Sequence, residues 1–479
     1  MRFLRLRLGW RLLGAGVLVL GLLALPGRAD AKTAYERKVD DSLAAAAAAA
    51  DPGTPLHVIA YGASEGRLKH ERHLGLIDAE SAIVTPEELV ALADDPGVKF
   101  ITLDLPVAPT AAGLPVSFPL LASLYPSIDG ASAAWSQGYT GAGIGIAVVD
   151  SGAVPGADFG GRLTQVQLPG QSSFADSYGH GTFVAGVAAG GGADGRYPGI
   201  APGASLYAVN VNDATGVYTS NVILGLDWID ANRLAYNIRV VNISLAETAA
   251  SSYMSSPLDS AVERLWRDGV LVVVSAGNRG PDTMQYAPAN DPFAIAVGAV
   301  DNLGTLATGD DREASFSSNG RTADGFYKPD VLAPGRQIPS ILPSGTTLGA
   351  QAPLLNLIAG GYATMSGTSF AAPQVAGTAA LLLQKHPEWT PDQVKWVLMQ
   401  TGRSLSGGGG RALDIGAALS YSGSLGAANQ GVTPAPQSTA SSDGSVTANT
   451  NSWNTNSWNT NSWNTNSWNT NSWNAFAWE

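Results

Sequence analysis

Short, continuously apolar runs alternate with longer helical stretches through the middle of the chain, from residue 140 to about residue 420. The runs are rich in β-branched residues and lack polar alternation, which indicates strands buried on both faces. They lie at residues 143–149, 206–211, 238–245, 270–276 and 294–300. The helical stretches lie at residues 182–189, 218–233, 257–267 and 370–385. This order predicts an α/β fold with a doubly wound parallel sheet, whose chemistry would lie beyond the carboxyl ends of the strands.

A smaller α+β pattern precedes this region. Residues 56–61, 76–84 and 98–103 indicate strands, and residues 86–93 indicate a helix. Thr85 is placed to cap that helix, and Glu88 completes a capping box. We therefore expect a small unit over residues 54–108. Residues 32–53 before it are expected to be a linker, with the alanine run at 44–50 forming a linker or a short helix.

The first 31 residues have the pattern of a secretory signal peptide. Four arginines in the first eleven residues precede an apolar run at 12–25, and Ala29 and Ala31 supply a small-x-small cleavage pattern. The alternative is an uncleaved anchor, for which the apolar run is short. We expect a secreted, extracellular mature chain without a transmembrane segment.

The end of the chain has a different composition. Residues 421–450 are rich in Gly, Ser, Thr, Ala and Pro, which is typical of a linker. From residue 451 to 479 the motif Asn-Ser-Trp-Asn-Thr repeats with a tryptophan at every fifth position from Trp453 to Trp473. Two alternatives remain open for this low-complexity tail. It is either a disordered polar-aromatic segment, or an element that binds the cell envelope or self-associates.

Composition restricts the function classes. The 479 residues carry a net charge of −12 and contain no cysteine, with 45% hydrophobic and 14% charged residues. The absence of cysteine excludes disulfides, thiolate nucleophiles and thiolate metal sites. The acidic balance argues against a nucleic-acid partner. The length alone suggests about three domains.

Four polar residues stand where predicted strands end or helices begin. Asp150 ends the first apolar run, and Asn278 follows the run at 270–276. His180 lies between glycines at the start of a small-residue helix, and Ser369 lies at the start of an apolar helix. Each alone is typical of a turn, a loop or a helix cap. Together they supply a nucleophile, a base, an orienting carboxylate and an oxyanion donor at one edge of the sheet.

The motifs around these residues resemble those of the subtilisin-like serine proteases (subtilases, peptidase S8). They are Asp-Ser-Gly at 150–152, His-Gly-Thr-x-Val-Ala-Gly at 180–186 and Gly-Thr-Ser-x-Ala-Ala-Pro at 367–373. The resemblance covers about residues 125 to 419 and implies a catalytic domain over 120–420. It implies that Asp150 orients His180 and that His180 is general base and then acid. It also implies that Ser369 attacks the peptide carbonyl and Asn278 stabilises the oxyanion.

By the same resemblance, Ser244, Leu245 and Ala246 are expected to bind substrate. Two positions depart from the usual family pattern. Phe370 replaces a methionine that often follows the nucleophile, which either removes an oxidisable sulfur or serves core packing. Ala246-Glu247 replaces a glycine pair, so that Glu247 either attracts basic substrate residues or is simply solvated.

The unit at 54–108 resembles the inhibitory propeptide of the same proteases. The resemblance implies that this segment inhibits its own enzyme and that self-cleavage falls between Pro106 and Pro126. No cofactor is expected for the chemistry. Family members often carry structural calcium; Asp194, Asp301, Asp310 and Asp311 lie in predicted loops and could supply oxygens, but the sequence assigns no metal residue.

Three function classes follow from these observations. The first is a secreted serine endopeptidase that acts on proteins or peptides through an Asp-His-Ser triad and an acyl-enzyme. The second is a surface-attached or self-assembling protein whose tryptophan tail is the main function. The third is a binding module on a protease fold, against which the intact motifs argue.

Overall fold

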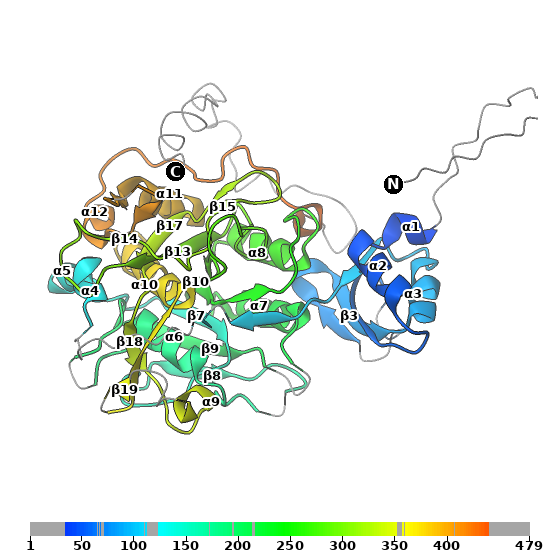
Figure 1. Cartoon of the computed structure of the whole chain (residues 1–479), viewed down its shortest axis with the longest axis horizontal. Helices are drawn as coiled ribbons and strands as arrows, with labels where there is room; N and C mark the ends of the chain where they lie inside the picture. The colour runs from blue at the N-terminus through cyan, green and yellow to red at the C-terminus, as the bar shows by residue number, and fades with distance from the viewer. Residues whose placement is uncertain are drawn as a thin grey trace, which may run out of the picture.

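The structure is a computed structural model. It describes residues 34–64, 66, 68, 71–109, 111–112, 123–171, 173–193, 196–212, 216–351, 357–358, 360–406 and 408–439. The expected signal peptide and the tryptophan-repeat tail lie outside the described residues. A large α/β unit carries a smaller unit on one side (Figure 1).

A ten-stranded sheet forms the core of the large unit. Its order is β21-β22-β17-β13-β12-β10-β7-β9-β8, with β14 paired to β13. The neighbours from β8 to β22 run parallel, and β7, β10, β12 and β13 are buried along most of their length. These strands are β7 (Gly145–Asp150), β8 (Leu163–Val166), β9 (Ser205–Asn210), β10 (Ile238–Ile243), β12 (Leu271–Ser275), β13 (Ile295–Asp301), β14 (Arg312–Glu313), β17 (Val331–Pro334), β21 (Arg403–Ser404) and β22 (Arg411–Ala412). The predicted α/β fold with a parallel sheet is confirmed.

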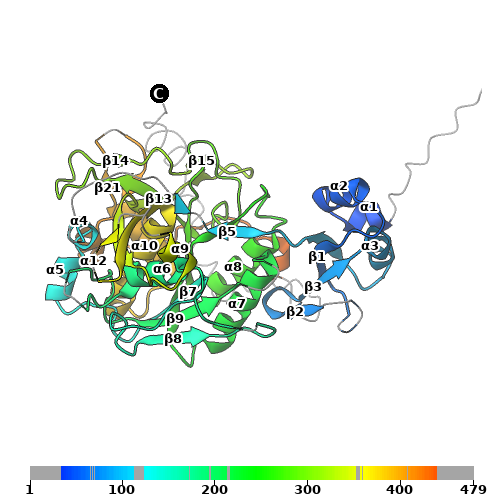
Figure 2. The same cartoon turned by 60° about the horizontal axis from the view of Figure 1, so that its bottom comes forward.

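Two pairs of helices pack on the sheet. Helices α6 (His180–Ala189) and α10 (Thr368–Lys385) contact each other, as do α7 (Thr219–Asn232) and α8 (Pro257–Arg267). Helices α6, α7 and α10 all contact β7, and α8 and α10 both contact β12. Figure 2 shows α7 and α8 side by side.

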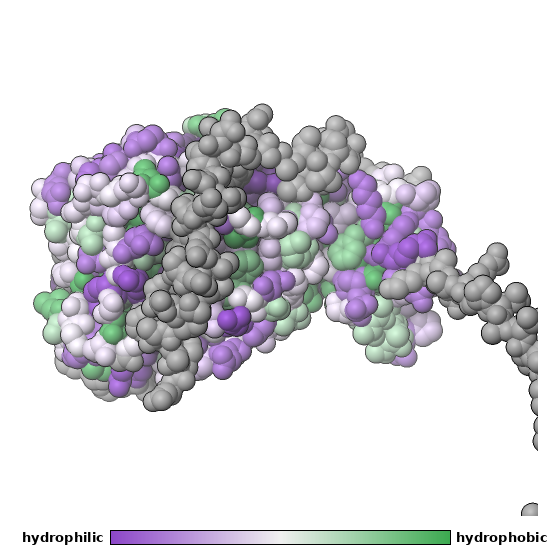
Figure 3. Space-filling view, turned by 90° about the horizontal axis from the view of Figure 1, so that it is seen from above, coloured by the Kyte–Doolittle hydropathy of each residue, from purple (hydrophilic) through white to green (hydrophobic). Residues whose placement is uncertain are grey.

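Shorter elements complete the large unit. They are α4 (Tyr125–Ile128), α5 (Ala131–Ser136), β11 (Leu245–Glu247), β15 (Gly320–Arg321), β16 (Tyr327–Lys328), β18 (Ile338–Ile341), α9 (Thr347–Ala350), β19 (Leu357–Ile358), β20 (Tyr362–Gly367), α11 (Pro391–Thr401), α12 (Ile415–Leu419) and η3 (Pro436–Thr439). No helix in the described part of the chain combines the length and apolar character needed to cross a bilayer. Hydrophilic residues are spread over both units on the face seen in Figure 3.

The small unit is a four-stranded sheet in the order β2-β3-β1-β4 with helices beside it. Its elements are α1 (Ala34–Lys38), α2 (Asp41–Ala49), β1 (Leu56–Tyr61), β2 (Arg72–Leu74), η1 (Gly75–Ile77), β3 (Ala79–Val84), α3 (Pro86–Ala93) and β4 (Phe100–Leu103). The capping box of Thr85 and Glu88 forms as predicted.

The expectation of a linker over residues 32–53 is wrong where the structure describes it. Asp40 caps α2 by accepting from the backbone N–H of Leu43, and the Leu43 side chain is fully buried in the small core. The alternative of a short helix for the alanine run is thus confirmed, and one leucine anchors this helix instead of an amphipathic stripe.

The expected linker over residues 421–450 is likewise wrong for its first part, because residues 421–439 pack on the large unit. We call residues 421–439 the C-terminal strap. Glu263 on α8 accepts from the Ala435 backbone N–H and the Ser438 hydroxyl, and Tyr253 donates to the Thr433 carbonyl. Ala435 is fully buried, so the large unit extends beyond residue 420 to at least residue 439.

The segment between the two units forms two short strands that pair with the large unit. Strand β5 (Val107–Pro109) runs antiparallel to β11, with Pro109 opposite Leu245 and Val107 opposite Glu247. Strand β6 (Ala111–Ala112) runs antiparallel to β20, with Ala111 opposite Gly367. The chain thus crosses the edge of the large unit next to the start of α10.

Candidate active site

Asp150 and His180 form a buried pair at the carboxyl edge of the sheet. Asp150 is the last residue of β7 and His180 the first residue of α6. His180 Nδ1 lies 2.8 Å from Asp150 Oδ1 and 3.0 Å from Oδ2, and both side chains are fully buried. Donation from Nδ1–H to the carboxylate leaves the lone pair of Nε2 to accept a proton. Nε2 has no hydrogen-bond partner among the described residues.

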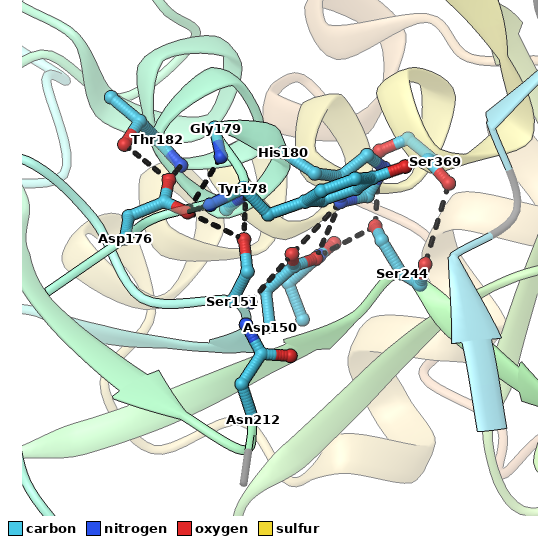
Figure 4. Close-up of polar contacts among 12 residues, drawn as sticks. Asp150, Ser151, Asp176, Tyr178, Gly179, His180, Thr182, Asn212, Ser244 and Ser369 are labelled. Carbon is cyan, nitrogen blue, oxygen red and sulfur yellow. Dashed lines mark hydrogen bonds and ion pairs between the residues drawn. The ribbon is translucent and has the colours of Figure 1, made fainter. Parts of the chain in front are cut away.

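Ser369 lies in the first turn of α10, next to this pair (Figure 4). The ring of the following residue, Phe370, has its centroid 5.5 Å from the His180 ring and 4.7 Å from the Phe183 ring. Ser369 Oγ lies 3.4 Å from the carbonyl oxygen of Ser244. Phe370 is fully buried, so it serves core packing; the effect on oxidation stays a prediction.

Asn278 follows β12 and faces the same turn of α10. Its Oδ1 accepts from the Thr368 backbone N–H at 3.0 Å, and Thr368 Oγ1 accepts from the Gly277 N–H at 3.1 Å. These bonds fix the orientation of the amide. The Asn278 Nδ2 has no hydrogen-bond partner in the part of the chain that the structure describes, so it can donate to a developing oxyanion.

The expected substrate-binding residues lie on or beside β11. Ser244 precedes the strand, and its hydroxyl donates to the Ser369 carbonyl at 3.0 Å. Leu245 and Ala246 are buried and pair with Pro109 and Ala108 of β5. The segment between the two units thus occupies the place where a substrate strand was expected.

Glu247 is buried, so its expected alternative as a solvated side chain is wrong here. Its side chain accepts from Thr219 Oγ1 at 2.8 Å, and it is 1% exposed. Burial, together with the nearby charge of Asp104, raises the pKa of Glu247 to about 7. An attraction for basic substrate residues stays a prediction.

Asp176 belongs to this site although no sequence motif singled it out. It is 3% exposed and lies in the loop before α6. Its carboxylate accepts from Ser151 Oγ at 2.8 Å and from the Gly179 and Thr182 backbone N–H groups at 2.7 and 2.9 Å. Burial raises its pKa. The only available signal was its position four residues before His180.

Three of the four aspartates considered for calcium lie in the described part of the chain, and Asp194 lies outside it. Asp301 pairs with Arg312 and Arg336, and Asp311 pairs with Arg403. Asp310 Oδ1 accepts from the Thr305 hydroxyl at 3.4 Å. No group of three or more His, Asp or Glu side chains in the described ranges is arranged to hold a metal ion.

Known proteins share this sequence and architecture. Residues 141–431 match the model of the Subtilase family (peptidase S8). Serine protease AprX of Bacillus subtilis is 39% identical over 286 residues, which cover 55% of this chain and 62% of AprX. Subtilisin E of Bacillus subtilis is 34% identical over 349 residues, which cover 71% of this chain and 80% of subtilisin E.

A solved structure also resembles this chain. Fervidolysin from Fervidobacterium pennivorans, described as a keratinolytic enzyme related to subtilisin, has a TM-score of 0.59 at 26% identity. The match covers 78% of this chain and 62% of that one. The chain thus spans less than two thirds of AprX and of fervidolysin, and more of subtilisin E.

Proposed function

Since this chain belongs to the subtilase family of serine proteases, we propose that it is an endopeptidase acting through Asp150, His180 and Ser369. The observation that carries the proposal is the fully buried Asp150–His180 pair beside Ser369 at the start of α10. Asn278 supports it, because its amide is fixed by Thr368 and its Nδ2 is available as a donor.

The proposed reaction follows from these atoms. His180 Nε2 takes the proton of Ser369 Oγ as that oxygen attacks the peptide carbonyl. Asp150 holds the proton on Nδ1 and stabilises the imidazolium that forms. Asn278 Nδ2 and the backbone N–H at the start of α10 stabilise the oxyanion. His180 then protonates the leaving amine, and water hydrolyses the acyl-enzyme by the same steps in reverse.

Substrates are expected to bind as an added strand. Strand β11 already pairs with β5 in this way, so its backbone is available to another extended segment once β5 leaves. Backbone pairing is independent of side-chain identity, and we propose protein and peptide substrates as a class.

We propose that residues 34–109 are an inhibitory propeptide that the enzyme cuts off itself. Asp104 accepts from the Ser220 backbone N–H at 2.8 Å at the start of α7. In return, Asp227 on α7 accepts from the Gly75 N–H at 2.9 Å. These bonds across the interface would hold the small unit in place after cleavage.

The position of the cut follows from the two short strands. Strand β5 ends at Pro109 and β6 begins at Ala111, and they pair on the two sides of the Ser369 turn. The pairing of these strands on either side of Ser369 supports a cut between Pro109 and Ala111, which lies within the expected range of 106–126.

A single comparison tests both proposals. The full chain and its Ser369→Ala variant are purified, assayed on casein and sequenced from their N-termini. We expect the wild type to hydrolyse casein and to begin at Thr110 or Ala111, and the variant to stay uncut and inactive. Ser438→Ala, which removes a buried serine hydroxyl in the C-terminal strap, is the control and should behave as wild type.

The two proposals have different contrary outcomes. Casein hydrolysis by Ser369→Ala would overturn the role of Ser369, and no hydrolysis by the wild type would overturn the protease assignment. An inactive but correctly cut Ser369→Ala variant would instead point to a separate processing enzyme. Asn278→Ala should lower kcat by about 10²–10³, the loss that removal of such a donor causes in a subtilisin.

We also propose that the protein is exported by its first 31 residues. The support is the basic and apolar pattern at residues 2–25 and the small residues Ala29 and Ala31. Expression with and without residues 1–31, followed by assay of medium and cells, tests this. Retention of both forms in the cell would contradict it. Binding of the strap-and-tail segment to isolated cell envelopes would test a role of the tryptophan repeats in attachment.

A further inference from the structure

Asp176 is a buried carboxylate that the proposed reaction does not use. It precedes α6 in the chain, is 3% exposed and makes all its contacts with the ends of the two elements that carry Asp150 and His180. A buried charge requires several good donors, and Asp176 has them. The question is what these bonds hold in place.

The two carboxylate oxygens bind on both sides of His180. Oδ1 accepts from the Gly179 N–H, and Oδ2 accepts from the Thr182 N–H and hydroxyl. Helix α6 has no side-chain cap from its own N-cap residue, Gly179. Asp176 therefore replaces the missing cap, and it constrains the turn in which His180 is the first helical residue (Figure 4).

Ser151 connects the same carboxylate to the end of β7. Its hydroxyl donates to Asp176 Oδ1 at 2.8 Å and accepts from the Gly181 N–H at 2.9 Å. Its backbone N–H donates to Asp150 Oδ1 at 2.8 Å. A continuous chain of hydrogen bonds thus runs from Asp150 through Ser151 and Asp176 to the turn of His180.

We propose that Asp176 is a positioning residue that fixes the imidazole of His180 against Asp150, with Ser151 as its link to β7. The proposal rests on the proposed triad. Asp150 itself can only orient the ring if the two elements that carry the pair keep a constant separation. Asp176 sets that separation by binding both.

The charge of Asp176 has a second effect on His180. It lies at the N-terminus of α6, where the helix dipole disfavours an imidazolium. A carboxylate there offsets the dipole, as Asp150 does from the other side of the ring. Among the described residues, Tyr178 also lies beside the ring, with its ring centroid 6.4 Å away. Loss of the Asp176 charge should therefore disfavour the imidazolium that forms during the proposed reaction.

The test compares Asp176→Asn, Ser151→Ala and the double variant with the wild-type full chain. Asparagine keeps the size and one acceptor, but loses the charge and the second acceptor. We expect Asp176→Asn to lower kcat by about 10- to 100-fold, the range that follows a misplacement of about 1 Å. KM should change by less than about threefold, and the acid limb of the pH profile of kcat/KM should move to lower pH.

The double variant tests the link itself. If Ser151 and Asp176 act through one hydrogen-bond chain, the loss in kcat of the double variant will be smaller than the product of the two single losses. Multiplicative losses would show independent effects and would overturn the role of Ser151 as the link.

Glu263→Gln is the matched control for loss of a buried carboxylate. Glu263 is fully buried and binds a backbone N–H and a serine hydroxyl, as Asp176 does, but it holds the C-terminal strap. Its kcat and pH profile should equal the wild type. Thermal unfolding identifies variants that fail to fold. If Asp176→Asn is one of them, Ser151→Ala must still lower kcat.

Ser369→Ala separates this inference from the proposed function. Full activity in Ser369→Ala would defeat the triad. If Ser369→Ala is inactive while Asp176→Asn keeps the kcat and the acid limb of the wild type, the proposed triad is retained. The positioning role of Asp176 is then overturned. A folded Asp176→Asn precursor that stays uncut, while Glu263→Gln is processed, would support it.

Discussion

The carboxylate of Asp104 is buried where the small unit meets the first turn of α7, so we expect the inhibitory contact to depend on pH. Asp104 is 5% exposed and accepts from the backbone N–H and the hydroxyl of Ser220. Burial outweighs these hydrogen bonds and the charge of Arg72, and raises the pKa of Asp104 to about 6 from its usual 3.8. Release of the small unit would return this side chain to water and to its usual pKa.

The sign of the effect follows from this difference. The group holds its proton more tightly in the docked state, so docking is strongest at low pH, where both states are protonated. The advantage is lost as the pH rises from about 4 through 6. A difference of about two pKa units corresponds to about 3 kcal/mol, or up to about 100-fold in the dissociation constant. Burial also raises the pKa of Glu247 to about 7, which extends the pH range of the effect to about pH 7.

The assay follows release of the cut small unit from the full-length product. The processed complex is incubated at pH 4 to 8, the free small unit is removed by size exclusion, and protease activity is measured at one fixed pH. We expect release to increase between about pH 4 and pH 7. Asp104→Asn should flatten this increase, and Asp94→Asn, which changes an exposed carboxylate of the same unit, should preserve it. Release that is independent of pH, or an unchanged slope in Asp104→Asn, would refute the reasoning.

Two further substitutions give expected outcomes elsewhere in the chain. An added methyl group at Gly181 would overlap the carbonyl oxygen of Gly152. Gly181→Ala should therefore destabilise the fold by about 1–3 kcal/mol, measured by thermal unfolding, and lower kcat, measured by peptide hydrolysis. Wild-type values for both would contradict this close contact. Glu263→Ala removes the acceptor of the Ala435 N–H and the Ser438 hydroxyl, so it should cost about 2 kcal/mol and expose the C-terminal strap to added thermolysin. Unchanged protection of the strap would argue that other contacts hold it.

The sequence predicts the positions of Asp150, His180 and Ser369 well because each one lies at the junction of a regular element and a turn. The buried apolar run before Asp150 and the helix after Ser369 form where they were expected. Parallel strands end at one edge of the sheet, so residues far apart in the sequence had to meet there. The capping box of Thr85 and Glu88 was predictable for the same reason, since it depends on local spacing alone.

Features that depend on tertiary contact were not predictable in this way. Leu43 anchors α2 within an alanine-rich stretch, and Ala435 anchors the strap within a stretch of linker-like composition. Asp176 lies in a loop without periodicity, and its role appears only when β7 and α6 come together. Glu247 was expected in solvent because its neighbours in sequence do not reveal the segment that covers it.

The pairing of β5 and β6 with the two sides of the nucleophile also limits which bonds in a protein can be cut. Residues 107–109 and 111–112 supply the two strands, so a substrate segment that pairs in this way cannot at the same time pair within its own fold. A stably folded substrate would therefore have to unfold locally, and the free energy of that opening would add to the barrier. Cleavage should concentrate in long loops and chain ends of native proteins, and short peptides should become better substrates as they lengthen toward six residues.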